Sequence, residues 1–229
     1  MDYDHVLILV SDDEMGRWLS QFLTPADELD TEHEGQGTSG QYFLLFNTFI
    51  ELLHLDDEEE AVRNEGRFGS RYANRWSDPA ACPFGFGVTT LVDPPFAGVE
   101  YAPLVGDGRG YWMSADNGEP GAPLLYATPP DRAYSRRSSI DDVEAIEDPE
   151  RRATVRAYLT HPSGAQTLTR VELVVPEEVL SLSSVQALDA FDEVEVRSGA
   201  EFEMRLVLDG GRQGLVETYG GRPRVVLVR

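Results

Sequence analysis

Lysine is absent from this chain of 229 residues, and all 19 of its basic residues are arginine. Cysteine is nearly absent as well. Cys82 stands alone, which excludes an internal disulfide framework and any zinc site built from several cysteines. No apolar run is long enough to span a bilayer. The acidic start, MDYDHVLILVSDDE, lacks the basic beginning and the longer apolar stretch of a signal peptide. We therefore expect a cytoplasmic protein.

Acidic residues outnumber basic ones by 41 to 19, and the formal net charge is −22. Such a chain repels nucleic acid and anionic membranes. Because no basic patch or basic helix is visible, we expect neither as a partner. At molar salt the Debye length falls to about 3 Å, which screens this charge. The composition resembles that of proteins from salt-accumulating halophiles. The alternative is a GC-rich genome, whose codons favour Arg over Lys. This alternative explains the excess of acidic residues less easily.

The first quarter of the chain has a readable order of elements. The apolar run HVLILV (5–10) predicts a strand, and Ser11 with Glu14 forms a capping-box signature that begins a helix. QYFLLF (41–46) and FIELLHL (49–55) predict two strands joined by a tight turn. With a weaker strand near residues 28–34, the order is β-α-β-β-β.

Later segments repeat this order. Residues 5–13 align without a gap with residues 170–178, and helical and strand patterns follow the second copy as they follow the first. Residues 84–95 predict a strand that runs into an acidic, proline-rich turn. With strands expected near residues 99–104, 110–114 and 123–128, they suggest another copy with a reduced helix. We therefore predict a two-unit domain at 1–128, a charged linker with a connecting strand at 129–167, and a third β-α-β-β-β unit at 168–229.

Four stretches carry a resemblance to a known family: DHVLILVSD, HEGQGTSG, FIELL and HPSGAQTLTRVELVV. They resemble the glyoxalase-like domain of the vicinal oxygen chelate superfamily, which includes glyoxalases, extradiol dioxygenases and bleomycin-resistance proteins. The resemblance implies an α+β fold whose repeated units form a cup-shaped mixed sheet around a small-molecule ligand or a metal. It implies a lyase, an isomerase or a dioxygenase acting at vicinal oxygens, or else a non-catalytic protein that sequesters its ligand.

His5 and Glu51 occupy positions where metal-binding members of that superfamily carry ligands. Strand alternation places each of them on an apolar face, and together they could bind one divalent metal ion. The equivalent positions are approximately Phe86 (or Gly85) and Tyr126 in the middle unit, and Arg170 and possibly Glu217 in the last unit, so only half of a metal site is visible. Without a metal, His5 and Glu51 could form an acid/base couple or a purely structural hydrogen-bonded pair.

Three more residues are candidates for ligand binding. His33 precedes a glycine-rich turn that would shape the mouth of the cup, and Trp112 and Tyr126 lie on expected strands of the middle unit. The third unit could also pair with its copy in a homodimer. No G-x-S-x-G motif is present and Cys82 has no neighbouring base, so nucleophilic catalysis has no support.

Overall fold

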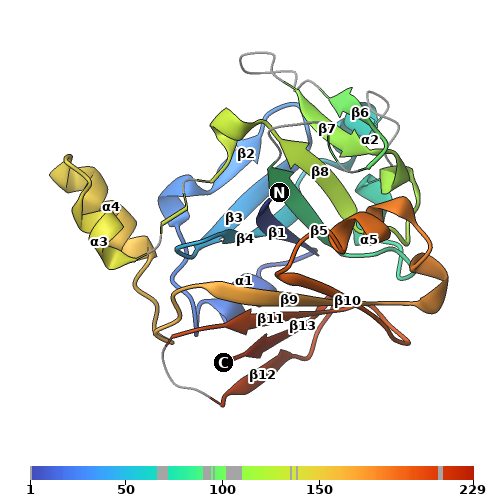
Figure 1. The fold of residues 1–229 in the computed structure, drawn as a ribbon. Coiled ribbons are helices and arrows are strands. Elements are labelled where there is room, and N and C mark those ends of the chain that lie inside the picture. The colour runs from blue at the N-terminus through green and yellow to red at the C-terminus, as the bar shows by residue number, and fades with distance from the viewer. Residues whose placement is uncertain are drawn as a thin grey trace.

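Two β-sheets with few helices make up the protein in a computed structural model (Figure 1). The structure describes residues 2–65, 72–89, 94, 96–101, 110–134, 136–137, 139–210 and 214–229. The larger sheet has eight strands in the order β2-β3-β4-β1-β5-β8-β7-β6 and curls into a half-barrel. The smaller sheet has five strands. The expected cup-shaped α+β fold is therefore confirmed.

The first half of the large sheet has the predicted β-α-β-β-β order. Strand β1 pairs in parallel with β4, β4 pairs with β3, and β3 pairs with β2 at the edge. The short helix α1 and the 3-10 turn η1 connect β1 to β2. The bounds are β1 Asp2–Val10, α1 Glu14–Leu19, η1 Asp27–Leu29, β2 Thr31–His33, β3 Thr38–Leu44 and β4 Phe49–Leu55.

The second half repeats this pairing. Strand β5 pairs in parallel with β8, β8 with β7, and β7 with β6, while β1 and β5 join the two halves in antiparallel fashion. The reduced helix expected after β5 falls mostly on residues 90–93 and 95, which lie outside the described ranges. The bounds are β5 Phe84–Thr89, β6 Gly98–Tyr101, β7 Tyr111–Ser114 and β8 Leu124–Thr128, with α2 Glu58–Glu65 and η2 Ala73–Trp76 before β5, η3 Ala115–Gly118 after β7 and η4 Pro130–Arg132 after β8.

Strand alternation separates the two faces of the large sheet. On β1, Val6 and Ile8 are fully buried and belong to one core with Val171 and Leu206 of the small sheet. This face therefore packs against the small sheet, as in a β-sandwich. The next residue along the other face, Leu7, belongs to a separate cluster on the concave side. The concave side is free to form a cavity.

The C-terminal segment has the expected β-α-β-β-β order of elements, followed by one more strand, but its strands pair differently from those of the first unit. Strand β9 is present where predicted, but it pairs with β10 in parallel and with β11 in antiparallel fashion, whereas β1 pairs with β4 and β5. The order is β10-β9-β11-β13-β12. Similar apolar patterns gave the alignment of β1 with β9, and such patterns determine which face is buried but not which strand is the neighbour. The bounds are β9 Leu168–Val175, η5 Glu177–Val179, α5 Ser183–Leu188, β10 Val194–Ser198, β11 Glu203–Leu208, β12 Val216–Tyr219 and β13 Arg224–Val228.

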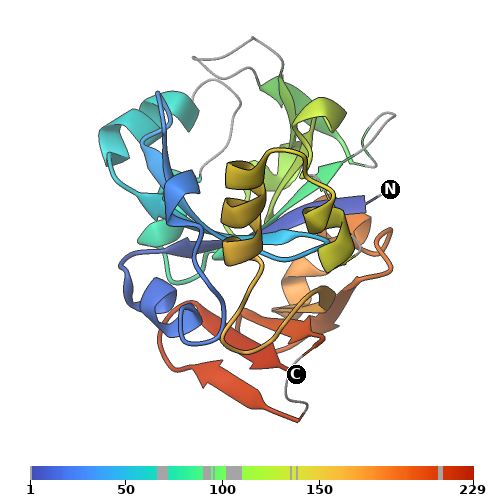
Figure 2. The ribbon, with the colours of Figure 1, turned by 90° about the vertical axis from the view of Figure 1, so that its left-hand side faces the viewer.

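The segment expected to be a linker with a connecting strand holds two helices instead, α3 (Ile140–Glu144) and α4 (Pro149–Tyr158). Ser139 and Asp142 form a capping box for α3, and Asp148 caps α4 ahead of a proline at the first turn. No residue of α4 is fully buried, and only the partly buried Val155 and Tyr158 pack against an apolar cluster, so the apolar pattern of this helix is weak. The pair lies at one side of the molecule, outside both sheets (Figures 1 and 2). No helix in the described ranges is long and apolar enough to cross a membrane.

Candidate functional site

A cavity of about 350 Å³ opens on the concave face of the large sheet. Strands from both halves contribute to its wall, and Asp4, His5, His33 and Glu51 bring ionisable side chains to it. One feature of its lining is a concentration of tyrosine. Six of the chain's nine tyrosines line the cavity: Tyr42, Tyr72, Tyr101, Tyr111, Tyr126 and Tyr134.

A β-bulge in β1 brings two polar side chains to the same face. Tyr3 lies opposite Val88 and His5 lies opposite Gly87, so Asp4 is an extra residue in the ladder. Such a bulge interrupts the alternation of side chains along a strand. As a result, an Asp4 carboxylate oxygen lies 2.8 Å from Nδ1 of His5, although the two residues are adjacent in the chain.

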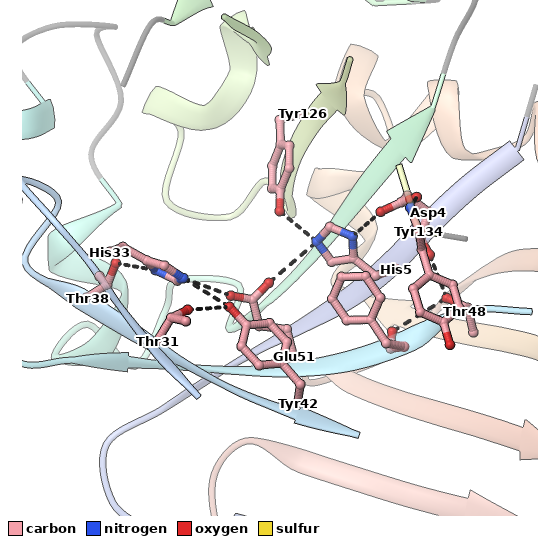
Figure 3. A network of polar contacts seen from close by, with 11 residues as sticks. Asp4, His5, Thr31, His33, Thr38, Tyr42, Thr48, Glu51, Tyr126 and Tyr134 are labelled. Carbon is pink, nitrogen blue, oxygen red and sulfur yellow. Dashed lines mark hydrogen bonds and ion pairs between the residues drawn. The ribbon is translucent and has the colours of Figure 1, made fainter. Parts of the chain in front are cut away.

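His5 is held on several sides. Its Nε2 lies 2.6 Å from the hydroxyl of Tyr126, and its ring stacks on Phe49 with centroids 4.2 Å apart at an interplanar angle of 14°. The side chain is 6 % exposed. Because an ionised carboxylate only accepts hydrogen bonds, Nδ1 of His5 carries a proton and donates it to Asp4. The other nitrogen of the ring, Nε2, is directed toward Tyr126 and Glu51 (Figure 3).

Glu51 comes from β4, the parallel neighbour of β1. One of its carboxylate oxygens lies 3.5 Å from Nε2 of His5, and the other lies 3.7 Å from Nε2 of His33. His33, on the edge strand β2, also contacts Thr38 Oγ1 at 3.0 Å and the hydroxyl of Tyr42 at 3.1 Å. The expected side-by-side placement of His5 and Glu51 on adjacent strands is confirmed, and His33 joins them (Figure 3).

The surroundings shift several pKa values. Burial tends to raise the pKa of Asp4, but hydrogen bonds from His5, Thr89 and the Tyr134 amide outweigh it, and the pKa of Asp4 is lowered. Burial, reinforced by the charge of Glu51, raises the pKa of Tyr42 and that of Tyr126 well above the usual tyrosine value. At neutral pH the cavity therefore contains an ionised Asp4 and neutral phenols that can donate hydrogen bonds.

The ligand-binding candidates divide into two groups. His33 and Tyr126 line the cavity as expected. Trp112 does not. It packs against the core between the two sheets, and its Nε1 donates to the carbonyl of Phe96. Alternation along β7 turns its neighbours Tyr111 and Met113 into the cavity instead.

Sequence reasoning missed several members of the site. Simple alternation places Asp4 on the face opposite His5, so the sequence did not indicate it as a site residue. The bulge in β1 turns its side chain to the same face as His5. Tyr134 lies in the segment expected to be a linker, yet its amide donates to Asp4 at 2.7 Å and its hydroxyl donates to the Leu45 carbonyl. Tyr42 lies beside Glu51 across the β3–β4 pair, where alternation from Glu51 could have found it.

A metal ion does not fit the described side chains as they stand. No group of three histidine, cysteine, aspartate or glutamate side chains in the described ranges is arranged to hold one. On the second half of the sheet, Gly85 and Tyr126 stand where further ligands would be needed. Nδ1 of His5 is bonded to Asp4 and Nε2 to Tyr126.

Comparisons with known proteins show the fold alone. No family model and no curated protein matches the sequence. Among solved structures, the crystal structure of a hypothetical protein from Staphylococcus aureus is similar, with a TM-score of 0.55 and 10% sequence identity. The match covers 99% of this chain and 98% of that chain, so the combination of the two sheets is shared along the full length.

Proposed function

We propose that the cup binds a small organic molecule and that His5, with Glu51, transfers a proton to or from it. The observation that carries the proposal is the Asp4–His5 pair, whose second ring nitrogen Nε2 is directed toward Glu51 and Tyr126 in a cavity of ligand size. A carboxylate that accepts from Nδ1 holds the ring in one orientation and leaves Nε2 as the nitrogen that can accept a proton. This is the arrangement of a general base.

The resemblance of the sequence to the vicinal oxygen chelate superfamily supports a substrate class. Removal of a proton from carbon beside a carbonyl creates an enolate, and neighbouring oxygens delocalise or hydrogen-bond the charge. In this cavity Tyr42 is a neutral phenol that could donate a hydrogen bond to such an oxygen. The Tyr126 hydroxyl donates to Nε2 of His5, and it could turn to the oxygen once Nε2 carries the proton taken from the substrate. We therefore assign isomerase-type or lyase-type chemistry on an α-hydroxycarbonyl compound, with His5 as the base and Glu51 as its partner.

Deuterium exchange tests this proposal without knowledge of the natural substrate. A panel of α-hydroxy ketones is incubated with the protein in D₂O, and loss of the C–H proton beside the carbonyl is followed by NMR. We expect catalysed exchange for at least one compound, its loss in His5→Asn and in Glu51→Gln, and no change on addition of EDTA. His54→Asn is the matched control, because His54 is partly exposed and lies outside the cavity lining.

The second candidate is a ligand-sequestering protein without chemistry. The observation that favours it is the number of cavity tyrosines whose hydroxyls are already bonded within the protein, as for Tyr72 to the Gln36 carbonyl and Tyr134 to the Leu45 carbonyl. Such side chains present ring faces rather than reactive groups. Saturable binding of the panel compounds with no exchange in the wild-type protein would contradict the enzyme and favour the binder.

A further inference from the structure

We infer that the ligand of this cup carries a cationic nitrogen, an amine or a quaternary ammonium group, attached to an aromatic or aliphatic frame. The inference rests on the proposed function in one respect only, that the cavity is a binding site. It does not depend on whether the protein is a catalyst. In the cavity, a buried carboxylate with long ion-pair contacts lies beside tyrosine rings that meet at steep angles.

The two carboxylates of the cavity differ in how closely charged groups approach them. Asp4 accepts from the His5 ring at 2.8 Å, from the Tyr134 amide at 2.7 Å and from the Thr89 hydroxyl at 3.2 Å. Glu51 is hydrogen-bonded to the Tyr42 hydroxyl, a neutral partner, and its ion pairs with His5 and His33 are 3.5 Å and 3.7 Å long. Charge-assisted hydrogen bonds normally measure about 2.7–2.9 Å. The Asp4 carboxylate has hydrogen bonds of normal length to its partners. The Glu51 carboxylate has no charged partner at that distance, so a cation could bind it more closely than the histidines do.

The histidines beside Glu51 are engaged elsewhere. His5 directs Nδ1 to Asp4 and Nε2 to the Tyr126 hydroxyl, and His33 contacts Thr38 and Tyr42. Glu51 is nevertheless only 5 % exposed. A buried carboxylate without a close counter-charge is costly, so a cation that enters the cavity gains most at this point.

Aromatic rings surround the same space at steep angles to one another. Tyr111 and Tyr126 meet at 87° with centroids 5.8 Å apart, and Tyr42 meets Phe49 at 63° and 5.8 Å. Rings at right angles form a corner in which a cation can contact more than one π-face. Each such contact is stronger where water is excluded than at an exposed site. The charge of Glu51 adds to the attraction, and it also raises the pKa of both Tyr42 and Tyr126.

The rest of the lining suits the frame of such a ligand. Leu7, Leu53, Met113 and Leu124 provide an apolar surface in the same cavity. A molecule with a cationic head and an apolar or aromatic body would bury the body against these side chains and bring the head to Glu51. An anionic head would be brought against Glu51 at close range and repelled.

Three matched probes test the inference: tyramine, tyrosol and 4-hydroxyphenylacetate. They share the 4-hydroxyphenyl frame and end in a cation, a neutral hydroxyl and an anion. Binding is measured by calorimetry in molar KCl at pH 7.5. The Debye length is then about 3 Å, so the exposed charges of the protein are screened. An alkylamine is protonated at this pH. We expect tyramine to bind at least tenfold more tightly than tyrosol and 4-hydroxyphenylacetate to bind most weakly.

Two variants distinguish the effect of the charge inside the cavity from the effect of the overall negative charge of the protein. Glu51→Gln removes one charge inside the cavity, and Glu58→Gln removes one from the exposed start of α2. We expect the tenfold preference to vanish in the first and to persist in the second, with thermal unfolding as a check that both remain folded. Equal binding of the three probes, a preference for the anion, a preference that survives Glu51→Gln, or no binding at all would each overturn the inference. The deuterium-exchange assay decides the proposed function separately.

Discussion

Gly87 lies directly opposite His5 across the β1–β5 ladder, and the His5 ring occupies the space where a side chain at position 87 would be. A Cβ at position 87 would overlap with Cε1 of that ring. The second half of the sheet therefore has no side chain at the position that the His5 ring occupies. The same strand turns Phe86 and Val88 to the opposite face, where they are fully buried.

Gly87→Ala should displace His5 without removing any of its partners. Because the ring is stacked on Phe49 and bonded to Asp4 and Tyr126, relief of the clash breaks at least one of these contacts. We expect a loss of about 1–3 kcal/mol in the free energy of unfolding and loss of the deuterium exchange. Gly220→Ala is the control, because a Cβ at that position would have no neighbour within 4 Å. Retention of full exchange by Gly87→Ala would contradict the role given to His5.

Asp4→Asn should reverse the tautomer of neutral His5. The amide oxygen can still accept from the Tyr134 amide, but the NH₂ group then faces Nδ1 of His5, which must accept instead of donate. The proton moves to Nε2, and the Tyr126 hydroxyl becomes its acceptor. Long-range ¹H–¹⁵N NMR of the imidazole distinguishes the two tautomers, with Thr89→Val as a variant that loses only a weaker contact of Asp4. An unchanged tautomer in Asp4→Asn would show that Asp4 does not orient the ring.

The sequence predicted the features that depend on local alternation. His5 and Glu51 were expected on one face because each lies among apolar residues with a period of two, and parallel pairing of β1 with β4 brings them together. Features that depend on a break in alternation could not be read in this way. The bulge that turns Asp4 toward His5 depends on the partner strand β5, about eighty residues away along the chain, which no local pattern reveals.

The sequence also did not indicate which strands pair with one another. HVLILVSDD and RVELVVPEE share a burial pattern, yet β9 pairs with β10 and β11, whereas β1 pairs with β4 and β5. Tyr134 shows the same difficulty for a single residue. It lies in a polar segment without periodicity, and it reaches the cavity only because its amide and hydroxyl find acceptors on Asp4 and Leu45.

His161 should make stability depend on pH between about 4 and 6.5. Its neighbours Pro162 and Gly164 are typical of a turn, and the structure shows its ring buried, with Nδ1 accepting from the Thr24 amide and Nε2 donating to the Leu44 carbonyl. Burial lowers its pKa from 6.5 to about 4. Above 6.5 the ring is neutral in both states. As the pH falls toward 4 the unfolded ring gains a proton that the folded ring resists, so stability is lost.

The full effect amounts to roughly 3 kcal/mol across that range. Urea unfolding at a series of pH values measures it as the difference between the wild-type protein and His161→Gln, because other groups titrate alike in both. His54→Gln serves as the control, since His54 is partly exposed. If the wild-type and His161→Gln curves run parallel between pH 6.5 and pH 4, His161 does not carry the pH dependence.

Salt should stabilise this protein more than an ordinary globular protein. The folded chain concentrates a formal charge of −22 on its surface, and unfolding moves these charges apart. Added salt screens exposed charges, and it strengthens apolar burial when its anion is excluded from the protein surface. Both effects act in the same direction, so the midpoint of thermal unfolding should rise substantially from low salt to molar KCl. A neutral globular protein of similar size, unfolded in the same series, provides the comparison. A midpoint that moves no more than that of the neutral protein would reject adaptation to high salt and leave GC-rich coding as the explanation for the missing lysine.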